Sequence, residues 1–227
     1  MKRFLCLGTV LFLVVLWSAC GDVFRPIIIP NPQQFPNPQA AHTVVTVNDN
    51  GTIVAGSAMV VDVTGDANSS QRNVGLRPVH AVQQSGTVVL VVNQSVSGAA
   101  QDSVTKLNFS GVGIGSTSTI TLPTSYNASG PTTSAPNFVA TTESNQAYVL
   151  MPSYQPVQGG GPFVPSIGVI NTTQNTVVTT IPVGNNPAAI TALADGSRAY
   201  VANQADGTVS IVARIRLSSG GTCTAQA

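Results

Sequence analysis

An internal repeat constrains the fold of this chain more than any other feature, because repeated units fold as copies of one supersecondary structure. Residues 60–62 read Val-Val-Asp, and residues 169–171 read Val-Ile-Asn. At the same spacing, the Val-Gly pair at 74–75 returns at 183–184. The architecture must therefore consist of similar units placed side by side.

A third copy lies between these two. Ala135-Pro136 precedes the run at 146–149 in the way that Asn186-Pro187 precedes the run at 198–201. The unit is thus about 50 to 58 residues long, a length typical of propeller blades or solenoid turns. The last unit contains four short runs rich in Val, Ile, Thr and Tyr, separated by Gly, Asn, Asp and Pro, which predict strands and turns. These runs are 167–171, 176–181, 188–193 and 198–203, and 208–212 begins the next set.

The last unit resembles the YVTN family of β-propeller repeats. The matching residues are Thr176-Val177-Val178, Thr180 to Gly184, Pro187, Asp195-Gly196 and the run Ala199-Tyr200-Val201-Ala202-Asn203. The resemblance is strong over 167–212, moderate over 57–93 and weak in the middle copy, where insertions rich in Gly, Ser and Pro interrupt it. It implies an all-β fold of four-stranded antiparallel blades.

The number of blades follows from the strand count. The chain after residue 41 has candidate strands for about three to four blades, whereas propellers have about 4 to 8. We therefore expect a short or incomplete β-propeller over residues 42–216, followed by a flexible tail at 217–227. Three readings stay open: a four-bladed ring, an open arc that needs partner subunits, and a shortened product of a longer gene.

The first twenty residues predict export. Lys2 and Arg3 precede an apolar run at 4–17 that is shorter than the roughly 20 residues of a membrane-spanning helix. The run ends in Trp17-Ser18-Ala19-Cys20, which resembles the bacterial lipobox. That resemblance implies a lipoprotein signal peptide over 1–19, a diacylglyceryl group on Cys20, and a place in the bacterial cell envelope, either periplasmic or surface-facing. Ordinary cleavage near Ala19 is the alternative.

A proline-rich segment follows at 20–41. Its five prolines favour the extended polyproline II conformation, so it is expected to act as a tether behind the lipidated cysteine. Ile27-Ile28-Ile29 could instead add an edge strand to the first blade. With Cys20 acylated, Cys223 would be the one cysteine left in the mature chain, which leaves no internal disulfide.

Composition excludes several kinds of site. Charged residues make up 7% of the chain and the net charge is +1, so the sequence shows no basic surface for nucleic acid. Two histidines, His42 and His80, without a cysteine pair or carboxylate cluster, predict no metal site and no cofactor. His80 is expected to pack or to form hydrogen bonds. No nucleophile motif is present, so we expect no enzyme and no catalytic residue.

The leading functional hypothesis is a lipid-anchored, non-catalytic binding scaffold. The membrane would be one partner, through the lipid, and a protein or glycan would bind the loop face. The loops at 110–116, 125–135 and 153–164 are the candidate contact surface, with Tyr126, Tyr154 and Phe163 as exposed aromatic side chains. Open blade edges would permit self-association. The alternatives are an enzyme similar to lactonase or quinoprotein propellers, and a truncated remnant of a longer propeller protein.

Overall fold

The structure is a computed structural model that describes residues 43–51, 53–63, 67–95, 101–111, 113–143 and 145–213. Every described residue lies within the unit Ala41–Ala227. The predicted signal peptide, Cys20, the whole tether at 20–41, His42 and the tail lie outside the described residues. Across the described ranges, no helix is long and apolar enough to cross a membrane.

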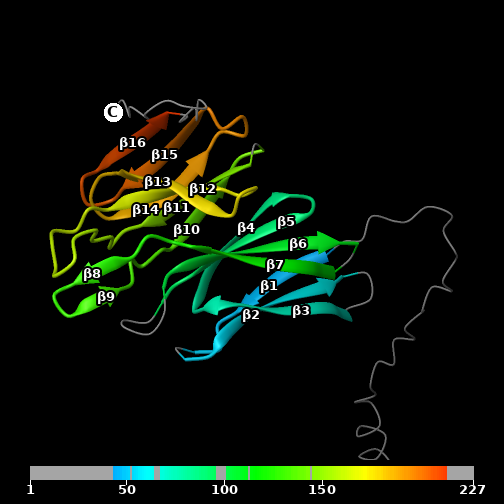
Figure 1. Cartoon of the computed structure of the whole chain (residues 1–227). Helices are drawn as coiled ribbons and strands as arrows, with labels where there is room; N and C mark the ends of the chain where they lie inside the picture. Colours follow the sequence, from blue (N-terminus) through cyan, green and yellow to red (C-terminus); the bar gives the residue numbers. More distant parts are fainter. Residues whose placement is uncertain are drawn as a thin grey trace, which may run out of the picture. The chain divides into compact units, whose positions relative to one another are not determined.

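All regular structure in the described ranges is β-strand (Figure 1). The strands are β1 (Thr43–Asn48), β2 (Ala55–Asp62), β3 (Ala67–Leu76), β4 (Pro78–Ser85), β5 (Val88–Asn93), β6 (Ser103–Ser110), β7 (Gly113–Thr121), β8 (Ser125–Asn127), β9 (Gly130–Thr132), β10 (Phe138–Thr141), β11 (Gln146–Met151), β12 (Ser166–Asn171), β13 (Thr176–Pro182), β14 (Pro187–Ala192), β15 (Arg198–Asn203) and β16 (Thr208–Ala213).

These strands form four antiparallel sheets in which chain neighbours pair. Sheet 1 is β1-β2-β3, sheet 2 is β4-β5-β6-β7, sheet 3 is β10-β11-β12-β13 and sheet 4 is β14-β15-β16. The short strands β8 and β9 form a separate hairpin between sheets 2 and 3 in the chain. The expectation of an all-β fold with about three to four propeller blades is confirmed. Two of the four sheets have three described strands each.

The sheets do not coincide with the repeat units. The first two strands of the last unit, β12 and β13, belong to sheet 3, while β14 to β16 belong to sheet 4. The four strands expected at 167–203 therefore do not form one blade, because the boundary between two sheets falls between the second and the third of them. Residues 183–186, between β13 and β14, carry the chain from one sheet to the next, where the Val183 amide donates to Pro165 O over 2.8 Å.

Three clusters of buried side chains join consecutive sheets. Sheets 1 and 2 share Ala58, Val60, Val74, Val89, Val91, Leu107 and Ile114. Sheets 2 and 3, with one residue that follows β7 and one from the β11–β12 connection, share Leu90, Val92, Val104, Ile120, Leu122, Val139, Ala147, Val149, Met151, Tyr154 and Ile170. Sheets 3 and 4 share Ala140, Tyr148, Leu150, Ile167, Val169, Ile190, Ala199, Val201 and Val212. No such cluster among the described residues joins sheet 4 to sheet 1, so the sheets form a series and not a closed core.

The apolar runs of the inner sheets follow from this arrangement. The second strand of sheet 2, β5, reads Val-Val-Leu-Val-Val-Asn, and its last five residues are all buried. A strand covered on both faces loses the alternation of apolar and polar residues that a half-exposed strand shows. Leu90 and Val92 face sheet 3, while Val89 and Val91 face sheet 1. The same holds for β11 in sheet 3.

A left-handed residue before a proline marks the start of three sheets. Arg77, Ala135 and Asn186 have φ angles of 42°, 52° and 49°, and each precedes the proline at or just before the first strand of sheets 2, 3 and 4. Positive φ is uncommon for residues other than glycine. Its recurrence at one place confirms the alignment of the three copies, including the loosely matched middle one.

A glycine, an asparagine and a hydroxyl side chain meet beside each of two of these turns. A Cβ atom on Gly184 would stand 2.6 Å from Asn203 Cγ, so no larger residue fits without movement. Asn203 Nδ2 donates to Ser210 Oγ over 2.9 Å, and the Gly184 amide donates to the same oxygen over 3.3 Å. This contact ties the chain that leaves sheet 3 to the second and third strands of sheet 4.

Sheet 2 repeats this trio with Gly75, Asn93 and Thr105. A Cβ atom on Gly75 would stand 2.7 Å from Asn93 Cγ. Asn93 Nδ2 donates to Thr105 Oγ1 over 3.0 Å, and the Gly75 amide donates to that oxygen over 3.3 Å. The repeated Val-Gly and terminal Asn of the sequence therefore serve one packing arrangement.

Sheet 3 replaces all three members of the trio. Thr133 stands three residues before its proline, as the glycines do, and Met151 ends β11 where Asn203 ends β15. Gly168 takes the place of the hydroxyl residue, and a Cβ atom there would stand 3.5 Å from Met151 Cε. An apolar side chain thus fills the space that a hydrogen-bonded amide fills in sheets 2 and 4.

Candidate functional site

The β8–β9 hairpin and residues 152–165 form one surface feature, which we call the loop platform. The Tyr126 amide donates to Gln155 O over 2.9 Å, and the Gln155 amide donates to Ser125 Oγ over 2.9 Å. Ser125 Oγ in turn donates to Ser153 O over 3.3 Å. Backbone and hydroxyl groups therefore hold the hairpin and the loop together.

The long loop is also ordered within itself. The Val164 amide donates to Tyr154 O over 2.8 Å, and Gln155 Nε2 donates to Gly161 O over 2.7 Å. Gly160 has a φ of 85°, and a Cβ atom on it would stand 3.0 Å from the Ala128 amide nitrogen in the hairpin turn. Glycine at this position allows the loop to lie against the hairpin.

The three aromatic residues expected on the contact surface differ in exposure. Phe163 is 63% exposed, and Val157 on the same loop is 54% exposed. Tyr126 is half-buried. The prediction that Tyr154 is exposed is wrong, because its side chain is only 9% exposed and belongs to the core cluster between sheets 2 and 3. Burial, with the nearby Tyr126 hydroxyl, raises the pKa of Tyr154 above its usual value.

The loop at 110–116, another expected contact loop, is instead mostly strand. β6 continues to Ser110 and β7 begins at Gly113, so the two strands form a long hairpin. Its end packs on sheet 1, because the Ile114 amide donates to Ser70 Oγ over 3.1 Å. The glycines that suggested a loop lie at the turn, where Gly111 has a φ of 62°, and near a register shift between Asn108 and Phe109.

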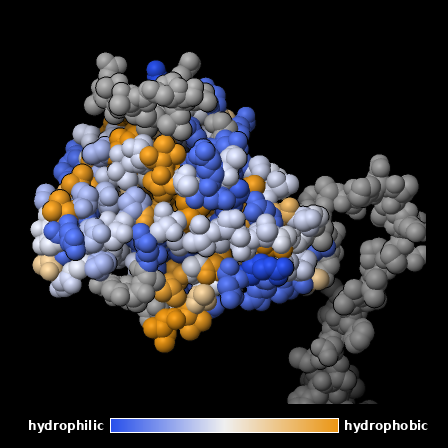
Figure 2. Space-filling model, viewed as in Figure 1, coloured by the Kyte–Doolittle hydropathy of each residue, from blue (hydrophilic) through white to orange (hydrophobic). Residues whose placement is uncertain are grey.

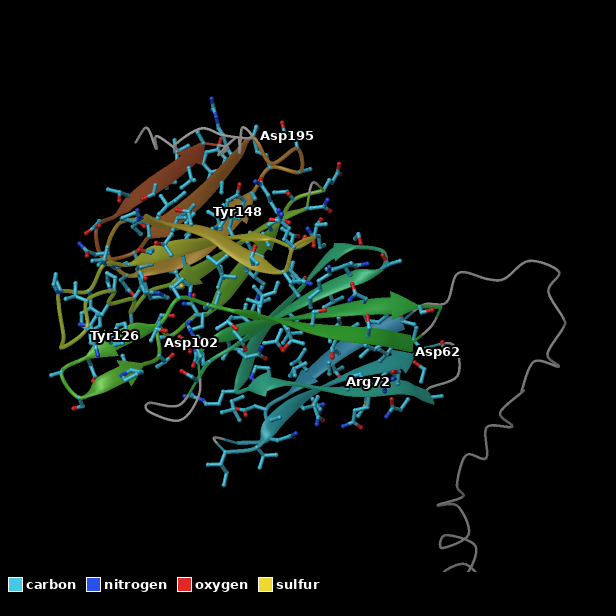
Figure 3. All side chains as sticks on the ribbon, in the orientation of Figure 1. Asp62, Arg72, Asp102, Tyr126, Tyr148 and Asp195 are labelled. Carbon is cyan, nitrogen blue, oxygen red and sulfur yellow. The ribbon has the colours of Figure 1, made fainter. Side chains whose placement is uncertain are left out.

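A buried carboxylate near the platform was missed by sequence reasoning. Asp102, 3% exposed, lies between sheet 2 and the hairpin that carries Tyr126 (Figure 3). One oxygen accepts from the Ser95 amide at 2.7 Å and from Thr133 Oγ1 at 2.9 Å. The other accepts from the amide and hydroxyl of Ser134 at 2.6 and 2.7 Å. These four donors make Asp102 a link between sheet 2 and the segment that leads into sheet 3.

His80 packs as expected. Its ring centroid lies 4.2 Å from that of Phe138, and its Nδ1 accepts from the Val139 amide at 3.4 Å. Burial lowers the pKa of His80 below its usual value, because desolvation disfavours the imidazolium form. The neutral ring therefore joins sheets 2 and 3 at their first strands.

Two aspartates occupy turns in sheet 4. Asp195 Oδ1 accepts from the Ser197 amide at 2.9 Å, which is an Asx turn. Asp206 accepts from the amide and the side chain of Asn185, and these hydrogen bonds lower the pKa of the Asp206 carboxyl. Neither is grouped with further ligands: the described residues contain no cluster of three or more His, Cys, Asp or Glu.

A cavity of about 240 Å³ lies between sheets 1 and 2. Its lining side chains are apolar apart from the hydroxyl of Thr43 and the amide of Gln83. The remaining lining residues are Val45, Ala81, Val82, Gly86, Val89 and Phe109. This lining supplies no titratable group for chemistry.

Comparisons with known proteins bear on the fold alone. No protein-family model matches the chain. No curated protein matches it either. Among solved structures, it is similar to hydrazine synthase of Kuenenia stuttgartiensis, with a TM-score of 0.57 and 13% identity over 75% of this chain. The match spans 55% of that chain. That protein contains β-propeller-like domains, and the likeness assigns the four described sheets to the same class of fold.

Proposed function

We propose that this chain is a non-catalytic binding scaffold of the bacterial cell envelope, held to a membrane by a lipid on Cys20. The observation that carries the binding role is the loop platform, where Val157 and Phe163 are more than half exposed on an ordered loop. Exposed apolar and aromatic side chains on a rigid support are favourable contact points, because little conformational entropy is lost on binding.

The groups near the platform support binding more than catalysis. A catalytic carboxylate needs an open position toward its substrate, whereas both oxygens of Asp102 are occupied by protein donors. Tyr154, with a raised pKa, stays protonated at neutral pH and is buried. The platform thus offers a contact surface of Phe, Val, Pro and Gln side chains for a protein or a glycan.

Photo-cross-linking in cells tests this role. With a benzophenone amino acid at position 157, we expect a discrete covalent adduct with one envelope component. Phe163→Ser is expected to lower the adduct yield about tenfold or more, since loss of a buried aromatic contact costs roughly 2 kcal/mol or above. Ile53→Ser is the matched control, because Ile53 is 89% exposed on the β1–β2 connection. A yield unchanged by Phe163→Ser would contradict the platform as the binding surface.

Metabolic labelling tests the anchor separately. Cells that express the full chain are grown with a radiolabelled or alkyne-bearing fatty acid, and label is expected on the protein. Cys20→Ala is expected to abolish the label, and Cys223→Ala should leave it intact. Label that persists in Cys20→Ala would exclude this lipidation site without affecting the platform.

A further inference from the structure

One face of sheet 4 has no partner among the described residues. In β15 and β16 the side chains opposite the core cluster include those of Tyr200, Ala202, Val209 and Ile211, and the exposed pair Arg198 and Ala213 lies at one end of the same face. Val209 is 59% exposed and Ile211 is 56% exposed. Tyr200 pairs with Ile211 and Ala202 pairs with Val209, so the four positions form a continuous patch, which we call the trailing face.

Of the equivalent positions in sheets 2 and 3, all but Lys106 are buried between sheets, and Lys106 is partly buried. In sheet 3 they are Tyr148 paired with Val169 and Leu150 paired with Ile167, at most 2% exposed, all in the cluster shared with sheet 4. In sheet 2 they are Leu90, Val92 and Val104, all fully buried against sheet 3, and Lys106, whose Nζ donates to Thr172 O of sheet 3 over 2.6 Å. The trailing face is therefore one half of a sheet-to-sheet interface.

Sheet 1 carries the other half. Val44 of β1 pairs with Val61 of β2, opposite the face that packs on sheet 2, and Val44 is 48% exposed. This pair, which we call the leading face, has a counterpart in every other sheet. The counterparts are Val89 with Leu107, Ala147 with Ile170, and Ala199 with Val212, and all six side chains are buried against the preceding sheet.

We propose that the trailing face of one copy of this chain packs on the leading face of a second copy, and that two copies close into a ring of eight sheets. The internal interfaces show how the contact is made, since each joins a trailing to a leading face. Figure 1 shows the four sheets following one another from β1–β3 to β14–β16, with these faces at opposite ends of the series. Four sheets from each of two chains give a count inside the range of about 4 to 8 blades seen in closed propellers.

This contact is heterologous, because two different surfaces meet. Such contacts form a ring when the rotation closes and a filament when it does not. A filament would leave one leading and one trailing face exposed at its ends, whereas a two-copy ring buries all four. The inference stands apart from the loop platform, which consists of the β8–β9 hairpin and the β11–β12 connection, so either can fail without the other.

Cysteine cross-linking in cells tests which faces meet. The full chain carries Cys223→Ser, Val44→Cys and Ile211→Cys, and cells are treated with a short bis-maleimide. We expect a covalent dimer and no higher multiples, since both junctions of a ring join the same two chains. Ile53→Cys with Ile211→Cys is the matched control and should stay monomeric, because Ile53 lies on the β1–β2 connection and not on the leading face. A ladder of multiples would overturn the ring, and monomer alone would overturn the second copy as the occupant of these faces.

A charge exchange gives an independent measurement on purified protein of full sequence. Ile211→Lys is expected to weaken the dimer at least about thirtyfold by light scattering, while Ile53→Lys leaves it unchanged. Adding Val44→Glu to Ile211→Lys should recover a large part of the loss, because each junction then holds opposite charges. All variants should keep the β-sheet circular dichroism of the parent. If the parent is monomeric, or if another part of the same chain covers the trailing face, Ile211→Lys would leave the molar mass from light scattering unchanged. Either result would contradict the proposal.

Discussion

The Asp102→Asn substitution is expected to lower the free energy of unfolding by about 2–4 kcal/mol. The carboxylate accepts four hydrogen bonds from Ser95, Thr133 and Ser134, at a position that is 3% exposed. An amide can offer one oxygen, and its NH₂ group would face two of these four donors. Urea unfolding of the full chain measures the change, and Asp102→Ala should cost at least as much.

Asp49→Asn is the control for this prediction. Asp49 is exposed and its Oδ1 accepts from the Gly51 amide at 2.9 Å, a contact that an asparagine oxygen can keep. Its effect should stay within about 0.5 kcal/mol. In Asp102→Asn, hydrogen exchange should accelerate first at either the Ser95 or the Ser134 amide, because these bond to different oxygens of Asp102 and the amide that faces the new NH₂ group loses its acceptor. An unfolding free energy equal to that of the parent would show that Asp102 does not hold sheets 2 and 3 together.

The second large effect is expected in sheet 3, where other residues take the places of the glycine, asparagine and hydroxyl residue found in sheets 2 and 4. Met151→Asn should lower the free energy of unfolding by about 3 kcal/mol, since it removes a fully buried thioether and buries an amide without a partner. Gly168→Ser should restore about 1–2 kcal/mol of that loss, because a hydroxyl there takes the place of Ser210 beside Asn203. The four free energies of this double-mutant cycle give the coupling directly.

Leu150→Asn provides the matched comparison. Leu150 is also fully buried and is next to Met151 in β11, but it faces sheet 4. It should be destabilising by a similar amount, and Gly168→Ser should give no recovery. Equal behaviour of the two cycles would mean that the glycine, asparagine and hydroxyl group do not act as a unit.

Strand positions could be read from the sequence, but sheet membership could not. β15 begins and ends at the residues expected, 198–203, because its Val, Tyr and Ala residues lie between clear turn signals. The connections at 172–175 and 183–186 are equally long, yet the first closes a hairpin within sheet 3 and the second passes to sheet 4. The length of a repeat does not show at which strand a sheet begins, and the connections within and between sheets are equally long. The boundary between sheets therefore cannot be determined from the sequence.

The candidate site was predicted in part for a similar reason. Phe163 and Tyr126 lie on the loop platform that the Gly-rich and Pro-rich segments suggested, but Tyr154 turns inward to complete the core. Asp102 gave no local signal, since its partner Ser134 is distant in the chain. Contacts that depend on two loops meeting in space leave no pattern of spacing in either loop.

The exposed apolar side chains of sheet 1 also separate into two kinds. Figure 2 shows a hydrophobic patch over the β1–β2 connection, where Ile53 and Val54 are 89% and 52% exposed. Val44 lies instead on the leading face and has a buried counterpart in each of the other sheets. Repeat equivalence, and not exposure, identifies which of these surfaces corresponds to an interface.

The boundary between sheets falls inside the repeat, and this has a consequence for how such chains change in length. Insertion or loss of one whole repeat adds or removes one complete sheet, while the first and last sheets keep the strands that they have now. Both terminal surfaces are then inherited unaltered. For the proposed ring, duplication within the gene would therefore alter how many copies are needed without redesigning the junction between them.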